Sequence, residues 1–417
     1  MNLEQVFESY KENIMPTYTK VPLVFVKGKG SKLWDIKGKE YLDFFPGWGV
    51  GNKGSKLWDI KGKEYLDFFP GWGVGNLGHC HPKVMDAVRD QISKLIFIPN
   101  NYHHVPQAKL AKEIVYWTYP AKVFFCNSGA EANEGAIKFA RKFGKGRYEI
   151  ITFEDSFHGR TLATLAATGQ KKYQEGFAPL PEGFKTVKFN DLEAVKKALT
   201  DKTVAIMLEL IQGEGGINIA SKDFVHGIKK ICEEKNLLLI VDEVQTGMGR
   251  TGRLFCYQHY GITPDIMTLA KALGGGLPIG MMVVKKEIAD TLQPGMHAST
   301  FGGGPVICKA ALASLTAIQK EKLLAKAQKT GEYLLEKLHK LRDRYPAINE
   351  VRGMGLMIGL DLNIPGKPLV EKCFEKGLLI NCTHDTVIRL MPALNISIKE
   401  VDRAIDIIEK SLIEVLK

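Results

Sequence analysis

Short apolar runs alternate with amphipathic stretches along the chain after Pro82. The apolar runs predict strands over residues 123–126, 148–153, 204–208, 237–241, 266–269 and 281–284. The stretches between them predict helices, including residues 131–143 and 224–235. Strands that alternate with helices in this way are typical of a mostly parallel sheet, so the pattern predicts a large α/β domain.

The last quarter of the chain has a different pattern, with long Lys- and Glu-rich helices expected within residues 310–341 around a few short strands. Ser397 and Glu400 form a Ser-x-x-Glu capping box, which predicts the start of a final helix. The apolar positions of this helix fall on one face: Val401, Ile405, Ile408 and Leu412. We therefore expect a large domain of residues 83–308 and a smaller α+β domain built from residues 1–82 and 309–417.

Residues 29–52 and 53–76 are identical over 24 positions, each reading KGSKLWDIKGKEYLDFFPGWGVGN. Each copy predicts a β-hairpin, because KLWDI and EYLDFF flank a Lys-Gly-Lys turn. Repeat architectures drift in sequence and need several units to bury a core. A single perfect repeat therefore indicates a recent tandem duplication, an engineered insertion or an error of sequence assembly.

The composition predicts a soluble globular protein, with 45% hydrophobic and 25% charged residues in a chain of 417. The longest apolar runs are too short to span a bilayer, and the first eleven residues lack an apolar signal core. Seven scattered cysteines without a CxxC pair favour reduced thiols in a cytoplasmic protein. The 57 basic residues are spread among 46 acidic ones, so the net charge of +11 indicates a solvated surface rather than a nucleic-acid site.

Small and polar residues follow several predicted strands directly, at the edge where open α/β sheets bind ligands. Residues 127–131 (Asn-Ser-Gly-Ala-Glu) open a predicted helix whose backbone N–H groups suit a phosphate. Many strand-to-helix turns are rich in small residues, so this signal is weak by itself. His79 and His81 have no third ligand at suitable spacing; we expect them to support a turn and expect no metal.

Asp242 and Lys271 carry a stronger signal, because each ends an apolar strand where a charge is costly without a partner. Asp242 is either a helix cap or salt-bridge residue, or a carboxylate that keeps a pyridine nitrogen protonated. Lys271 precedes Ala-Leu-Gly-Gly-Gly, and burial there would lower its pKa and make it an amine nucleophile. The GGGLPIG stretch lacks the GxGxxG spacing of a dinucleotide site, which argues against a nicotinamide-dependent oxidoreductase.

Six ordered motifs surround this pair: NSGAEAN, SFHGRT, IQGEGG, DEVQTGMGRTG, LAKALGGGLPIG and STFGG. In order and spacing they resemble class III aminotransferases, which are fold-type I pyridoxal-phosphate enzymes. LGHCHPKV and RLMPALNI extend the resemblance over essentially the whole chain. MPTYTKVPLVFVKGKG and LWDIKGKEYLDF are most similar to the branch that acts on N2-acetyl-L-ornithine in arginine biosynthesis.

The resemblance implies pyridoxal 5′-phosphate as the cofactor. Lys271 would hold it as a Schiff base and move the substrate proton, while Asp242 would pair with the ring nitrogen. Phe157 would stack on the ring and Gln245 would lie near the ring hydroxyl. The other residues implied in cofactor binding are Ser128, Gly129, Ala130, Glu243, Val244 and, from the partner subunit of a homodimer, Thr300.

The resemblance also implies a substrate site for an amino donor and 2-oxoglutarate. Arg160 would clamp one substrate carboxylate, and Arg389 would clamp the α-carboxylate of glutamate or 2-oxoglutarate. Glu214 would pair with Arg389 when the other, amine-bearing substrate is bound. The further substrate-site residues implied are Ser299, Tyr18 and Trp72. Taken singly, Phe157 would more often be a core residue and Arg389 a surface or salt-bridge residue.

The chain departs from the family pattern at two places. The family usually has Gly-Gly-Asn-Pro after the phosphate-binding threonine, where this chain has Gly303, Gly304 and Pro305. The other departure is the duplication; because Trp72, Gly73 and Val74 run directly into Leu-Gly-His, as in the family, we expect Trp72 rather than Trp48 beside the cofactor. The closest alternatives are ornithine, 4-aminobutyrate, succinylornithine and succinyldiaminopimelate aminotransferases, and a cofactor-free binding protein is a further one.

Overall fold

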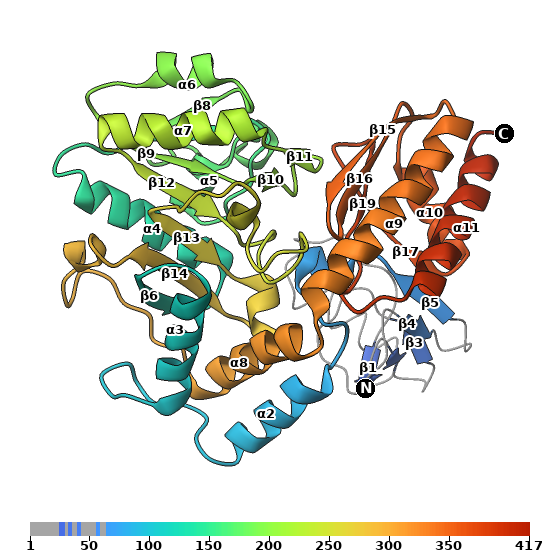
Figure 1. Ribbon diagram of the computed structural model, residues 1–417, viewed down its shortest axis with the longest axis horizontal. Helices are drawn as coiled ribbons and strands as arrows, with labels where there is room; N and C mark the ends of the chain where they lie inside the picture. Colours follow the sequence, from blue (N-terminus) through green and yellow to red (C-terminus); the bar gives the residue numbers. More distant parts are fainter. Residues whose placement is uncertain (1–24, 30–31, 36–39, 43–55, 59–63) are drawn as a thin grey trace.

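The computed structural model describes residues 25–29, 32–35, 40–42, 56–58 and 64–417 (Figure 1). A larger body contains the central sheet, and a smaller body beside it contains the C-terminal helices. The first strands of the chain lie under the smaller body, so both ends of the chain contribute to that side of the molecule (Figure 1). The proposed domain boundaries at residues 82 and 308 stay a prediction.

A seven-stranded sheet with the order β6-β14-β13-β12-β9-β7-β8 forms the centre of the larger body. Its strands are β6 (Ala121–Cys126), β7 (Glu149–Phe153), β8 (Phe184–Val187), β9 (Thr203–Leu208), β12 (Leu238–Asp242), β13 (Ile266–Leu269) and β14 (Gly280–Lys285). Only β14 runs antiparallel to its neighbours. The mostly parallel α/β sheet and all six strands predicted from the apolar runs are confirmed, and β8 is an additional edge strand.

Helices cover both faces of this sheet. Successive side chains of a strand point to opposite faces, so an apolar strand buries side chains against helices on both sides. In β12, Leu239 and Val241 join one hydrophobic cluster, whereas Leu238 and Ile240 join another. The helix α4 (Gly129–Phe143) packs into the second cluster and α7 (Lys222–Lys235) into the first. Burial on both faces explains why these strands read as continuous apolar runs rather than as alternating ones.

Shorter elements complete the larger body. They are α2 (Pro82–Ile92), α3 (Val105–Trp117), α5 (Leu162–Ala167), α6 (Leu192–Ala198), β10 (Ile211–Gln212), β11 (Asn218–Ile219) and the 3₁₀ turns η1 (Pro70–Gly73), η2 (Lys171–Tyr173), η3 (Cys256–His259), η4 (Lys271–Gly274) and η5 (Ala289–Thr291). The long helix α8 (Pro305–Lys320) contacts α2 and α3 and then leads into the smaller body (Figure 1).

The smaller body contains an antiparallel sheet with the order β15-β16-β19-β18. Its elements are α9 (Leu323–Arg344), β15 (Ile348–Met354), β16 (Met357–Leu362), α10 (Lys367–Glu375), β17 (Leu378–Leu379), β18 (Asn381–Thr383), β19 (Val387–Leu390) and α11 (Ile398–Val415). Ser397 caps α11 with its hydroxyl and Glu400 bonds back to the Ser397 amide, so the predicted capping box is confirmed. The four apolar positions predicted for one face of α11 are all buried.

The duplicated segment forms two hairpins in a second sheet, with the order β1-β2-β3-β4-β5-β17. Its strands are β1 (Phe25–Lys29), β2 (Lys32–Asp35), β3 (Glu40–Leu42), β4 (Lys56–Trp58) and β5 (Glu64–Asp67). Both copies have the same register, with residue 32 opposite 42 and residue 56 opposite 66, so both predicted hairpins are confirmed. Of the two, the second copy joins the C-terminal segment, because Leu66 of β5 pairs with Leu378 of β17.

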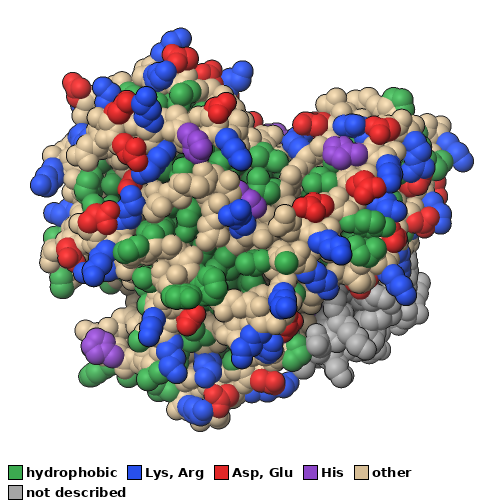
Figure 2. Space-filling view, viewed as in Figure 1, with side chains coloured by type: hydrophobic (Ala, Val, Ile, Leu, Met, Phe, Trp, Pro, Cys, Tyr) green, Lys and Arg blue, Asp and Glu red, His purple; other side chains and the backbone are tan. Residues whose placement is uncertain are grey.

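The molecular surface carries charges of both signs. Figure 2 shows Lys, Arg, Asp and Glu side chains interspersed over the face in view. None of the seven cysteines forms a disulfide in the described residues. Among the helices that the structure describes, each is too short or too polar to cross a membrane.

Candidate functional site

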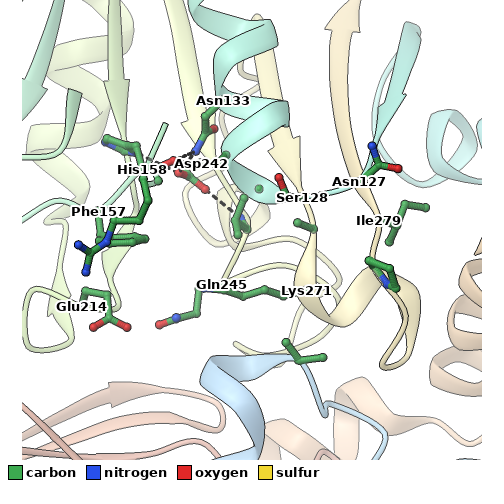
Figure 3. Close-up of a pocket in the computed structure, with 18 of the residues that line it drawn as sticks. Asn127, Ser128, Asn133, Phe157, His158, Glu214, Asp242, Gln245, Lys271 and Ile279 are labelled. Carbon is green, nitrogen blue, oxygen red and sulfur yellow. Dashed lines mark hydrogen bonds and ion pairs between the residues drawn. The ribbon is translucent and has the colours of Figure 1, made fainter. Parts of the chain in front are cut away.

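A cavity of about 460 Å³ opens at the carboxyl edge of the central sheet. Its wall includes residues that follow β6, β9, β12 and β13, together with Val74 from the second copy of the duplicated segment. In Figure 3, Phe157 and Glu214 lie on one side of the cavity and Asn127 and Ile279 on the other, with Gln245 and Lys271 between them. The predicted ligand edge of the sheet is therefore the edge that holds the cavity.

Asp242, the last residue of β12, is a buried carboxylate whose partners are fixed by the protein. Its Oδ2 atom lies 2.8 Å from both Asn133 Nδ2 and His158 Nδ1, and its Oδ1 accepts from the Val244 amide at 3.0 Å (Figure 3). Thr268 donates to the Asn133 amide oxygen, which fixes the orientation of that side chain. These contacts fix the position of the carboxylate, and among the described residues no Lys or Arg forms an ion pair with it.

Lys271 begins the turn η4 directly after β13, the strand next to β12. Its backbone has a positive φ of 44°, an unusual conformation for a side-chain-bearing residue and one that occurs often at functional sites. Burial lowers the pKa of the Lys271 ammonium, and the carboxylates of Glu214, Asp242 and Glu209 oppose this effect. A lysine of lowered pKa has more of its amine in the neutral, nucleophilic form.

The N-terminus of α4 forms a second wall of the cavity. Ser128 caps the helix by accepting from the Glu131 amide, and Gly129 and Ala130 begin its first turn. A Cβ atom at Gly129 would lie 2.8 Å from Val244 Cγ1, so the close approach of this turn to the strand requires glycine. The free N–H groups and the positive end of the helix dipole make this wall suitable for an anion.

Gln245 presents an unsatisfied hydrogen-bond acceptor to the cavity. Its Nε2 donates to the Trp72 carbonyl at 3.1 Å, while its buried Oε1 has no partner among the described residues. A Cβ at Gly213 would overlap this oxygen, so the glycine leaves room for it. Buried polar atoms are nearly always paired in native proteins, so the free oxygen indicates a ligand that donates a hydrogen bond.

Arg160 and Phe157 lie at the Glu214 side of the cavity. The guanidinium carbon of Arg160 is 4.0 Å from the ring centroid of Tyr173 and 5.5 Å from that of Phe157. The two rings meet edge to face at 5.8 Å. Phe157 is only partly buried, so its ring is a wall of the cavity as well as a packing group.

Arg389 is almost fully buried, and each of its three guanidinium nitrogens donates at least one hydrogen bond. Its Nη1 donates to Glu214 Oε1 at 2.7 Å and to the Gly213 carbonyl at 2.8 Å, while Nε and Nη2 both donate to Asn381 Oδ1. The ring of Phe69, in the second copy, lies under the guanidinium with its centroid 4.7 Å away. Burial raises the pKa of Glu214, but the charge and hydrogen bonds of Arg389 more than offset this and hold it below its usual range.

Glu209 is a site residue that the sequence interpretation missed. It lines the cavity, and its two oxygens accept from the Phe157 amide at 2.8 Å and the Gly213 amide at 3.1 Å. Burial raises its pKa to about 7. The signal was present, since Glu209 follows an apolar strand directly, as Asp242 does. Asn133 and His158 were also missed, and no pattern of the sequence alone pairs them with Asp242.

Several expected site residues lie elsewhere in this subunit. The carboxylate of Glu243 accepts from the Tyr257 amide and from the Thr246 hydroxyl, so it holds a loop instead of lining the cavity. Ser299 accepts from Asn127 at 3.2 Å beside the cavity, and Thr300 is exposed and outside it. Trp72 is not part of the cavity wall, but its carbonyl accepts from Gln245, which is.

Two further expectations concern residues near the start of the chain. Tyr18 and Trp48 lie outside the described residues. His79 and His81 lie 3.3 Å and 3.2 Å from the carboxylates of Asp67 and Glu321, respectively. Within the part of the chain that the structure describes, no three His, Cys, Asp or Glu side chains are grouped as metal ligands would be.

Comparison with known proteins gives one consistent result. Residues 51–412 match the family model for class-III aminotransferases, a match that begins just before the second copy of the duplicated segment. Acetylornithine aminotransferase from Methanocaldococcus jannaschii is 52% identical over 100% of both chains. The crystal structure of ornithine aminotransferase from Toxoplasma gondii has a TM-score of 0.87 at 32% identity, covering 100% of this chain and 96% of that one. That of acetylornithine aminotransferase from Elizabethkingia anophelis has a TM-score of 0.81 at 31% identity, covering 99% and 100%.

Proposed function

Because the chain belongs to the class-III aminotransferase family, we propose that it transfers the amino group of N2-acetyl-L-ornithine to 2-oxoglutarate with pyridoxal 5′-phosphate as cofactor. The products are N-acetyl-L-glutamate 5-semialdehyde and L-glutamate, so the reaction belongs to arginine biosynthesis. The observation that carries the proposal is the meeting of Lys271 and Asp242 at adjacent strand ends in one cavity, whose Glu214 side holds Arg160 and, paired with Glu214, Arg389.

The donors and acceptors of the cavity fit the cofactor. The N-terminus of α4 suits its phosphate, and the unsatisfied Gln245 oxygen suits its ring hydroxyl. Phe157 offers a flat face for the ring, and Asp242 offers a fixed carboxylate for the ring nitrogen. Bound there, pyridoxal phosphate supplies a protonated ring that withdraws electrons from the substrate carbon during proton removal.

Side chains of the protein hold the cofactor ring protonated, transfer the substrate proton and exclude water. Asp242, held by Asn133 and His158, keeps a proton on the ring nitrogen through its charge. Lys271 Nζ moves a proton on and off the substrate carbon that bears the amino group, and its lowered pKa leaves more of its amine free to accept that proton. Val74 and the Gly-rich turn after Lys271 help to close the cavity against water.

The two arginines allow one cavity to take two different substrates in turn. Arg160 is available to bind a carboxylate of either substrate by bidentate hydrogen bonds. Arg389 is paired with Glu214, so it offers no free positive charge to an amine-bearing substrate. When 2-oxoglutarate binds, its second carboxylate replaces Glu214 at Arg389, which is the exchange that a ping-pong reaction needs.

The central test is a visible absorbance scan of the purified protein before and after borohydride. We expect a cofactor band that borohydride removes, with the pyridoxyl group then found on Lys271 by mass spectrometry. The Lys271→Ala variant, with its fold checked by circular dichroism, should show no reducible band. A parent protein without such a band, or a band unchanged in Lys271→Ala, would rule out the proposed chemistry.

The amino donor is tested separately. Steady-state rates with N2-acetyl-L-ornithine, ornithine, 4-aminobutyrate, succinylornithine and succinyldiaminopimelate should give the highest kcat/KM for the acetylated donor. A higher value for another donor would leave the reaction class intact and replace the substrate.

We propose in addition that the enzyme is a homodimer in the cytoplasm whose partner subunit completes each site with Thr300. Exposed apolar side chains near this residue support an interface, including Ile96, Phe97 and Phe301, and the lack of disulfides among the described cysteines supports a reducing compartment. Subunits carrying Lys271→Ala and Thr300→Asp should each have little activity, and mixing them should restore part of it. Mixed dimers with no gain would exclude shared sites.

A further inference from the structure

The two arginines of the cavity are held in opposite ways. Arg389 is buried and its three guanidinium nitrogens all donate to protein acceptors. Arg160 is exposed to the cavity, and among the described residues none accepts a hydrogen bond from its guanidinium or forms an ion pair with it. An unpaired arginine side chain ordinarily samples many rotamers, so something other than hydrogen bonding has to keep this one in place.

The contacts that Arg160 does make are with aromatic faces. Its guanidinium carbon lies 4.0 Å from the centroid of the Tyr173 ring, and the Phe157 ring is a second, more distant support at 5.5 Å. Stacking on a ring uses the flat face of the guanidinium and leaves its edge N–H groups free. A carboxylate binds to that edge with two parallel hydrogen bonds.

Tyr173 is itself rigidly placed. It ends the turn η2, where its amide donates to the Gln170 carbonyl at 3.0 Å. Gln170 is buried and donates to the carbonyls of Asp155 and Ser156, directly before Phe157. Gln174, on the other side, donates to the carbonyls of Leu165 and Thr168 at 3.0 Å and 2.9 Å. These bonds tie Tyr173 to the segment that carries Phe157 and Arg160.

From this geometry we propose that Tyr173 is a positioning residue that sets carboxylate affinity, because its ring holds the Arg160 guanidinium with its edge toward the cavity. The inference rests on the proposed function for the identity of the substrates, but carboxylate binding at Arg160 can be measured without turnover. The tyrosine ring, and not its hydroxyl, carries the effect, since the contact is with the ring face. Lys172 also lies over this ring, at 5.1 Å, and its side chain is exposed.

The test compares Tyr173→Leu with Tyr173→Phe in the full-length holoenzyme. The leucine variant should bind glutarate about threefold to tenfold more weakly by calorimetry and raise KM for 2-oxoglutarate by a similar factor, with little change in kcat. The phenylalanine variant should behave like the parent. Tyr148→Leu is the matched control, because Lys202 lies over the Tyr148 ring at 5.8 Å and this tyrosine is not part of the cavity wall.

Two further readouts separate positioning from general damage. The rate at which O-methylhydroxylamine, an amine without a carboxylate, removes the cofactor absorbance should be unchanged in Tyr173→Leu. In an Arg160→Ala background, Tyr173→Leu should cause no further loss of glutarate affinity, since the two side chains act as one unit. An equal loss in both backgrounds, or parent-like affinity in Tyr173→Leu, would overturn the proposal. A parent without a reducible cofactor band would contradict the proposed function and leave the calorimetric result standing.

Discussion

Glu214 and Arg389 form an ion pair that closes one end of the cavity, with 2.7 Å between Glu214 Oε1 and Arg389 Nη1. Only 1% of the Arg389 side chain is exposed, against 16% for Glu214, so the carboxylate is the partner that can turn away. Breaking a buried pair leaves an uncompensated charge, which is costly until another carboxylate replaces the lost one. We therefore expect the pair to couple substrate binding to the stability of the smaller body.

The Glu214→Gln variant should reveal the coupling between substrate binding and stability. Glutamine can still accept from Arg389 but brings no charge, so we expect the free energy of unfolding to fall by about 1–3 kcal/mol. Added 2-oxoglutarate should restore more of the melting temperature in the variant than in the parent, because it supplies the missing charge. Glu350→Gln, at the exposed partner of Arg352, is the control. Equal ligand-induced shifts in parent and variant would argue against the exchange of carboxylates at Arg389.

Glu243 should make stability depend on pH in an unusual direction. Burial raises its pKa to about 7, whereas the unfolded chain has the ordinary value of 4.5. Between these values the folded state keeps a proton that the unfolded state releases, so the free energy of unfolding falls as pH rises through this window. The difference in pKa corresponds to about 3 kcal/mol at most, and the loss persists above pH 7.

Replacing Glu243 by glutamine removes this titration and preserves an acceptor for the Tyr257 amide. Relative to the parent, Glu243→Gln should gain stability from pH 5 to about pH 7 and keep that gain at pH 8, in urea unfolding followed by fluorescence. Glu209 has a raised pKa as well, so the parent's own pH profile contains both effects and only the difference reports Glu243. A constant difference between the two proteins at all pH values would refute this assignment.

Gly304 provides a test of stability away from the cavity. It is the N-cap residue of α8 and supplies no side-chain cap, although its φ of −59° and ψ of 158° suit asparagine. An added Cβ would lie 3.5 Å from the Phe301 carbonyl, an ordinary contact. We expect Gly304→Asn to raise the free energy of unfolding by about 0.5–1 kcal/mol, through the cap and through a stiffer unfolded chain.

The alanine variant at this position separates the two causes. Gly304→Ala shares the unfolded-chain effect but has no capping oxygen, so it should be less stable than Gly304→Asn in the same denaturant titration. Equal stability of the two variants would show that the asparagine does not cap α8.

The sequence predicted those site residues that directly follow a predicted strand. Asp242 and Lys271 are charged residues at the ends of apolar runs, and this local contrast predicts a ligand-facing position. Glu209 is likewise a charged residue at the end of an apolar run. Its place there predicts a ligand-facing position in the same way, although Glu209 was not included among the expected site residues. Glu243 was expected at the cofactor from the family resemblance alone, and in this structure its carboxylate accepts from the amide of Tyr257, in a loop outside the cavity wall.

Other parts could not be predicted because they depend on contacts between distant residues. His158 and Asn133 reach Asp242 from 84 and 109 positions away, and neither stands out locally. Tyr173 likewise becomes significant only when Arg160 is seen over its ring. The short strands of the smaller body were predicted without residue bounds, because strands as short as β17 and β18 give little periodic signal.

The two identical copies should differ in what they contribute to stability. Leu66 is fully buried where β5 pairs with β17, so Leu66→Ala should lower the free energy of unfolding by about 2–5 kcal/mol. Leu42 occupies the same position of the first copy, which has no pairing with β17 among the described residues. We expect Leu42→Ala to cost much less, as measured by urea unfolding. Equal costs would mean that both copies are structurally required.

Deleting one copy should leave the chemistry intact, because the cavity receives Val74 from the second copy and the family match begins at residue 51. Removal of residues 29–52 gives the same polypeptide as removal of 53–76, so the junction adds no new sequence. In the shortened chain, β1 should pair with β4 as it now pairs with β2, since β2 and β4 have the same letters. We expect an unchanged kcat and cofactor band together with a higher yield of soluble protein, because one unneeded set of aromatic residues is gone. Loss of the cofactor band on deletion would show that the first copy also supports the site.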